Sequence, residues 1–121
     1  MKKKQGILLI ALLISANVFS QTLNDAIRLT DNEQYESAST VFRVLISNEP
    51  SNATNYYYFG ENYLFSDNAD SALMMYNQGA KIDPNNLLLQ IGQAKYQLNM
   101  YSVAETKRNS NIANDDYNGA K

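Results

Sequence analysis

The feature that most constrains this chain is a helical pattern that returns after 34 residues. Pro50 and Pro84 lie 34 positions apart, and each follows an acidic residue. Before each proline, apolar residues are spaced by three and four, which places them on one face of a helix. Within residues 53–84 the pattern gives two helices with a turn at Ser66 to Asn68, and Pro84 ends the unit because proline cannot continue a helix. We therefore predict an all-α protein built from stacked helical hairpins.

Small residues support this interpretation because they recur within each expected hairpin at an interval of 12. The pairs are Ala26 and Ala38, Gly60 and Ala72, and Gly92 and Ala104. The distance between two packed helices depends on the side chains at their contact. We expect each pair to mark the place where the two helices of a hairpin approach closely.

The pattern resembles the tetratricopeptide repeat family, whose period is about 34 residues with two helices per repeat. The matching residues of the middle repeat are Tyr56, Phe59, Gly60, Tyr63, Ala72, Tyr76, Ile82, Asp83 and Pro84. Those of the first are Ala26, Leu29, Tyr35, Ala38, Phe42, Leu45 and Pro50, and those of the third are Leu88, Ile91, Gly92, Tyr96, Tyr101 and Ala104. The resemblance implies a short right-handed solenoid of about three antiparallel hairpins over residues 21–112.

The expected repeats cover residues 21–52, 53–84 and 85–112. The second helix of the third repeat, from Ser102 to about Ile112, is polar, with Arg108 and Asn111 where the earlier repeats are less polar. Such a helix is typical of a solvating end cap, or of a frayed repeat. Residues 113–121 show no periodicity and are predicted to be a disordered tail.

Residues 1–20 are predicted to be a secretory signal peptide. Lysines 2–4 precede an apolar run over residues 6–14, and Val18 and Ser20 suit cleavage before Gln21. The apolar run is about half of the ~20 residues that span a bilayer, so we expect no stable membrane insertion after cleavage. An uncleaved anchor or a buried helix are the alternatives. With a composition typical of an AT-rich bacterial genome, the prediction is export to the periplasm or cell envelope of a bacterium.

The composition excludes several classes of function. The chain has no Cys or His, which removes the usual zinc ligands and the thiol nucleophile. The carboxylates are scattered and no pair lies in a catalytic motif, so we expect no enzyme, cofactor or metal site. After Ser20 there are 7 basic and 12 acidic residues, a net charge of −5. This charge argues against nucleic acid and anionic membranes as partners.

The remaining class is a protein that binds another protein or a peptide. The family resemblance implies that the first helix of each repeat lines a concave face. The residues expected on that face are Leu23, Ile27, Tyr57, Glu61, Leu64, Phe65, Leu89, Gln93 and Tyr96. An apolar and aromatic patch of this kind usually marks an interaction site. We predict an exported scaffold with a peptide-binding groove.

Other interpretations of the same residues stay open. They could fill space between helices, or they could mediate self-association in a homo-oligomeric structural adaptor of the envelope. The chain could also be a truncated N-terminal fragment of a longer tetratricopeptide protein.

Overall fold

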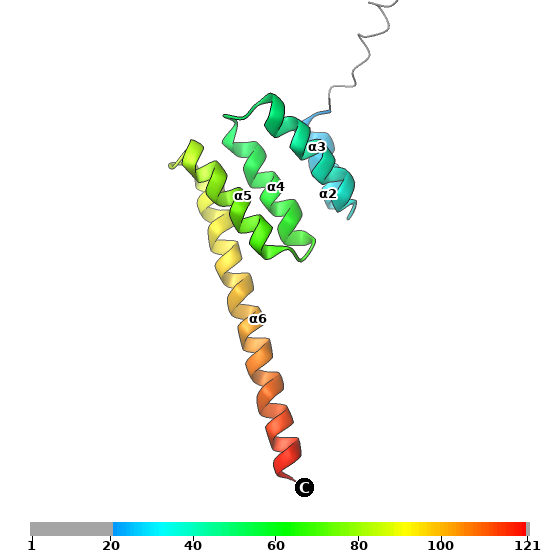
Figure 1. The fold of residues 1–121 in the computed structure, drawn as a ribbon, viewed down its shortest axis with the longest axis vertical. Coiled ribbons are helices and arrows are strands. Elements are labelled where there is room, and N and C mark those ends of the chain that lie inside the picture. Colours follow the sequence, from blue (N-terminus) through cyan, green and yellow to red (C-terminus); the bar gives the residue numbers. More distant parts are fainter. Residues whose placement is uncertain (1–20, 121) are drawn as a thin grey trace, which may run out of the picture.

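A computed structural model describes residues 21–120, which contain five α-helices and no β-strand (Figure 1). The helices are α2 (Leu23–Asp31), α3 (Tyr35–Asn48), α4 (Ala53–Phe65), α5 (Ala69–Ile82) and α6 (Leu87–Gly119). The predicted all-α class is thus confirmed for this part of the chain. The signal peptide predicted for residues 1–20 lies outside the described residues.

Polar residues between the apolar runs determine where the helices begin. Thr22 and Asp25 form a capping box: the Thr22 hydroxyl accepts from the Asp25 N–H, and the Asp25 carboxylate accepts from the Thr22 N–H. Asn52, Asn68 and Asn86 cap α4, α5 and α6, each accepting a backbone N–H with its side-chain oxygen.

The first two hairpins turn in the same way. Glu33 and Asp67, 34 residues apart, have φ angles of 60° and 59°. Beyond them, the N–H of Gln34 donates to the Leu29 carbonyl and the N–H of Asn68 donates to the Tyr63 carbonyl, both at 2.9 Å. A left-handed residue followed by such a bond is a common way to end a helix. The pairs α2–α3 and α4–α5 fall within the residues expected for the first two hairpins.

The prediction of a third hairpin is wrong, because residues 87–119 form one continuous helix, α6. The capping residues Asn52 and Asn86 lie 34 positions apart, which sets a register two residues away from the expected match of Gly92 to Gly60. In this register Tyr101 takes the place of Asp67, where a turn would need a positive φ, and bulky side chains strongly disfavour that conformation. Residues 93–118 also contain no Gly or Pro that would interrupt a helix. Residues 113–119, expected to be disordered, continue α6, which extends away from the other helices (Figure 1).

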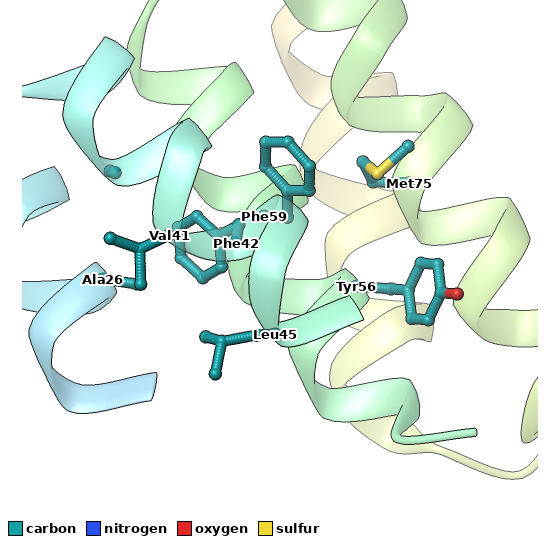
Figure 2. Close-up of a cluster of buried hydrophobic side chains, with 8 residues drawn as sticks. Ala26, Val41, Phe42, Leu45, Tyr56, Phe59 and Met75 are labelled. Carbon is teal, nitrogen blue, oxygen red and sulfur yellow. The ribbon is translucent and has the colours of Figure 1, made fainter. Parts of the chain in front are cut away.

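Two clusters of buried side chains hold the helices together. The first joins α2, α3, α4 and α5, and Figure 2 shows the Phe42 and Phe59 rings within it. These two rings are stacked, with centroids 5.2 Å apart. The second joins α4, α5 and α6, and its members are Ala53, Tyr57, Ala72, Tyr76 and Leu89.

Two of the expected small residues, Gly60 and Gly92, lie against the same tyrosine ring. A Cβ atom on Gly60 would lie 2.3 Å from the ring of Tyr76, and one on Gly92 would lie 2.5 Å from the same ring. The two glycines of α4 and α6 therefore make room for one fully buried tyrosine on α5. Ala104, expected to pack within a hairpin, is exposed on α6.

Candidate functional site

A half-open hollow of about 200 Å³ lies where α2 and α4 face each other. Its lining residues are Ile27, Thr30, Asp31, Phe42, Tyr58, Glu61 and Phe65. The floor includes Phe42, which is fully buried, whereas Phe65 stands at the end of α4 with 56% of its surface exposed. The hollow therefore combines aromatic and aliphatic walls with two carboxylate side chains.

A second hollow of about 220 Å³ continues the first toward the turn between α2 and α3. It shares Thr30, Asp31 and Phe65 with the first and adds Glu33 and Tyr35. Phe65 thus borders both hollows. Asp31 and Glu33 are exposed, and their side chains have no ion-pair partner among residues 21–120. The two hollows form one groove with an acidic edge.

The nine residues that the sequence placed on one concave face do not form one surface. Ile27, Glu61 and Phe65 line the groove, and Leu23 packs half-buried against the first core cluster. Tyr57 and Leu89 are buried, 8% and 1% exposed, inside the second core cluster, with Leu64 packed against it. For these three residues the packing interpretation describes the structure better than a groove.

The last two residues of the predicted face lie on α6. The Gln93 side chain donates a hydrogen bond of 2.9 Å to Asn77 on α5, so it joins two helices. Tyr96 is half-buried and lines neither hollow. The groove is therefore built by the first hairpin and α4, and α6 takes no part in its lining.

Glu61 is the carboxylate of the predicted face, and it is 7% exposed. Tyr76 donates its hydroxyl to one carboxylate oxygen at 2.7 Å, and the Lys95 ammonium donates to the other. Both donors come from other helices, so Glu61 links α4 to α5 and α6. The Glu61 carboxylate therefore stabilises the packing of these helices, although it also lines the groove.

The electrostatics of this cluster follow from burial and from the charge of Glu61. Burial, then the hydrogen bond to Glu61, raises the pKa of Tyr76 far above its usual value, so the phenol stays protonated and donates. Burial alone lowers the pKa of Lys95, but the hydrogen bond and charge of Glu61 outweigh it, and the net pKa is raised. Burial, then the Glu61 charge, also raises the pKa of Tyr57.

A second polar cluster sets the distance between the helices that form the groove. The Asn62 amide on α4 donates to Ser39 Oγ at 2.9 Å and to the Tyr35 carbonyl at 3.2 Å on α3. Its oxygen accepts from Thr30 Oγ1 on α2 at 2.9 Å. Asn62 is 1% exposed, so these bonds form away from water and fix α4 against the first hairpin.

Sequence reasoning missed four of the residues that line the first hollow: Thr30, Asp31, Phe42 and Tyr58. For three of them, the spacing in the sequence could have indicated their position. Thr30 and Asp31 follow Ile27 by three and four positions, and Tyr58 precedes Glu61 by three, the spacings that share one helix face. Phe42 is one of the matching residues of the first repeat, and in the structure it belongs both to the first core cluster and to the lining of the hollow.

Residues 21–120 contain no cluster of three or more acidic, His or Cys side chains that could hold a metal ion. Among these residues, none of the helices combines the length and the apolar character needed to cross a membrane. Neither a scan against protein-family models nor a search of curated proteins found a match to this chain.

Proposed function

We propose that this protein is an exported protein-interaction scaffold of the tetratricopeptide type, which binds a peptide segment in the groove between α2 and α4. The repeat interpretation is supported by two hairpins with equivalent left-handed turn residues 34 positions apart. Export rests on the signal-peptide pattern of residues 1–20. The observation that carries the binding proposal is the half-open hollow of about 200 Å³ with Phe65 exposed at its edge.

The chemistry of the groove defines the peptide. Exposed aromatic surface beside a concave wall favours an apolar or aromatic side chain of the ligand. Asp31 and Glu33 at the edge favour a neighbouring Lys or Arg, because a cation there meets unpaired carboxylates. The preferred segment is therefore a short peptide that carries an apolar anchor next to a basic residue.

An array of immobilised peptides with random sequences tests this proposal, probed with the purified product of the full-length sequence. We expect the bound peptides to be enriched in Lys or Arg next to an apolar residue. Phe65→Ala should weaken binding of a selected peptide at least tenfold, since a buried aromatic anchor typically contributes more than about 1.4 kcal/mol. Asp31→Asn should weaken only the peptides that contain a cation.

Met74→Ala is the matched control. Met74 is 49% exposed on α5, comparable to Phe65, and lines neither hollow of the groove. Circular dichroism of all variants should match that of the wild type. An array without enrichment, or equal losses for Phe65→Ala and Met74→Ala, would contradict the groove as the binding site.

A further inference from the structure

The face of α6 that points away from α5 carries an exposed apolar stripe. Its members are Leu87, Ile91, Ala94, Leu98 and Tyr101. Leu87 and Leu98 are each 70% exposed, and Tyr101 is 67% exposed. The spacing alternates between four and three residues, the 3.5-residue period of a seam between two helices. A second helix is therefore the kind of surface that fits this stripe.

The preceding hairpin shows what such a face does in this fold. Positions 34 residues before Leu87, Ile91, Ala94 and Leu98 are Ala53, Tyr57, Gly60 and Leu64 on α4. That face of α4 packs against α5, with Tyr57 beside Ala72 and Tyr76, and with Gly60 against the Tyr76 ring. The stripe on α6 is thus the counterpart of a face that binds a helix. Residues 102–119 would supply that helix in a third hairpin, but they continue α6 without a turn and leave the stripe exposed.

The other half of α6 also requires a partner. Every residue in 101–120 is exposed, and this segment is rich in Asn, Asp and Ser, which are weak helix formers. In proteins most of the stability of a helix comes from packing of one of its faces rather than from propensity. One half of α6 therefore presents a surface that binds a helix, and the other half is a helix that needs such a surface.

We propose that two copies of the chain pair through antiparallel α6 helices, so that the C-terminal half of each α6 covers the stripe of the other. Continuing the 4–3 spacing adds Glu105, Arg108 and Ile112 to the seam. In the antiparallel register centred between Asn99 and Met100, Leu98 faces Tyr101 of the second copy, and Leu87 faces Ile112.

The charged positions also fit this register. Glu105 faces Ala94, whose small side chain leaves the carboxylate a path to solvent, and the Arg108 stem covers Ile91. Glu105 and Arg108 form an ion pair of 3.6 Å on their own helix, so neither charge enters the seam unpaired. The pairing is a domain swap: the contacts that a third hairpin would make within one chain are made between two chains.

Light-scattering mass tests the proposal on the purified product of the full-length sequence. We expect the mass of a dimer for the wild type and a twofold lower mass for Leu98→Glu. Met100→Glu is the matched control, because Met100 is 41% exposed only two residues away and lies on the opposite side of α6. It should remain dimeric. A monomeric wild type, or dissociation of both variants alike, would overturn the proposal.

Disulfide trapping gives a second test that does not depend on stability. The chain contains no Cys, so a single introduced cysteine is unique. Leu98 faces Tyr101 of the second copy, so a mixture of Leu98→Cys chains and Tyr101→Cys chains should form a disulfide-linked heterodimer on mild oxidation. A mixture of Leu98→Cys chains and Met100→Cys chains should not. Equal cross-linking in both mixtures would place the contact elsewhere.

Discussion

Adding one methyl group at Gly60 should destabilise this fold, although alanine is the better helix former. The new Cβ would lie 2.3 Å from Cε1 and 2.7 Å from Cδ1 of Tyr76, and ordinary contact begins at 3.4 Å. The ring would have to move by about 1 Å, within packing as dense as a crystal. It has little room to do so, because Gly92 of α6 borders the same ring atoms and the Tyr76 hydroxyl is bound to Glu61.

Two opposing contributions set the size of the effect. Gly→Ala inside a helix gains about 1 kcal/mol of helix propensity. Overpacking of a tight core costs typically about 1–3 kcal/mol and sometimes more, and a contact this short belongs at the upper end. We therefore expect a net loss of about 1–2 kcal/mol of unfolding free energy for Gly60→Ala, which lowers the Tm of a domain of this size by roughly 5–15 °C.

Thermal and urea unfolding followed by circular dichroism measure this loss. Gly119→Ala is the control, because no atom lies within 4 Å of its added Cβ, and it should change stability by only a few tenths of a kcal/mol. The same Gly60→Ala change in a Tyr76→Val background should be neutral or stabilising, since the obstructing ring atoms are gone. A Gly60→Ala protein as stable as the wild type, or an unchanged cost without the Tyr76 ring, would refute the reasoning.

Two further predictions concern the polar residues. Asn62→Leu should lower the unfolding free energy by about 2–4 kcal/mol, because it removes the three hydrogen bonds that the Asn62 side chain makes with Thr30, Ser39 and the Tyr35 carbonyl. Urea unfolding beside the control Asn99→Leu on α6 measures this loss, and an equal loss in the control would contradict the role of the buried cluster. Hydrogen bonds from the Thr22 backbone and hydroxyl lower the pKa of Asp25 below its usual 3.8, so its stabilising contribution is present above that pH and is lost as the pH falls through the lowered value. The Tm difference between wild type and Asp25→Asn should accordingly shrink on acidification, and a difference that stays constant across this range would contradict the assignment.

Local signals in the sequence predicted where the second hairpin turns and where it ends. The turn expected at Ser66 to Asn68 lies between α4 and α5, and α5 ends at Ile82, before Pro84. These features depend on residues within a few positions of one another, so periodicity and cap chemistry are enough to locate them.

The groove could not be predicted to the same extent, because it depends on how each helix is rotated about its axis. The run of aromatics in α4 offers an apolar residue on every side, so the pattern alone cannot choose between Tyr57 and Phe65 as the exposed one. The choice is made by long-range partners: Asn62 binds α2 and α3, and Tyr76 binds Glu61. These contacts span 15 to 32 residues of sequence and leave no periodic trace.

The straight course of α6 has a local cause that can be tested by one substitution. Glu33 and Asp67 adopt positive φ at the equivalent positions of the first two hairpins, and Tyr101 takes their place in α6. Tyr101→Gly removes the Cβ that opposes a left-handed turn and lowers helix propensity by about 0.5–1 kcal/mol at that position. Residues 102–119 should then fold back onto the stripe of their own chain and give a compact monomer.

Leu98→Glu is the reference for this prediction, because it should also be monomeric but should retain the extended α6. Small-angle X-ray scattering should therefore give a smaller radius of gyration for Tyr101→Gly than for Leu98→Glu at equal mass. Equal radii at that mass would show that the residue at position 101 does not control the turn. A Tyr101→Gly protein that stays dimeric would show that two chains hold α6 straight more strongly than the left-handed turn can bend it.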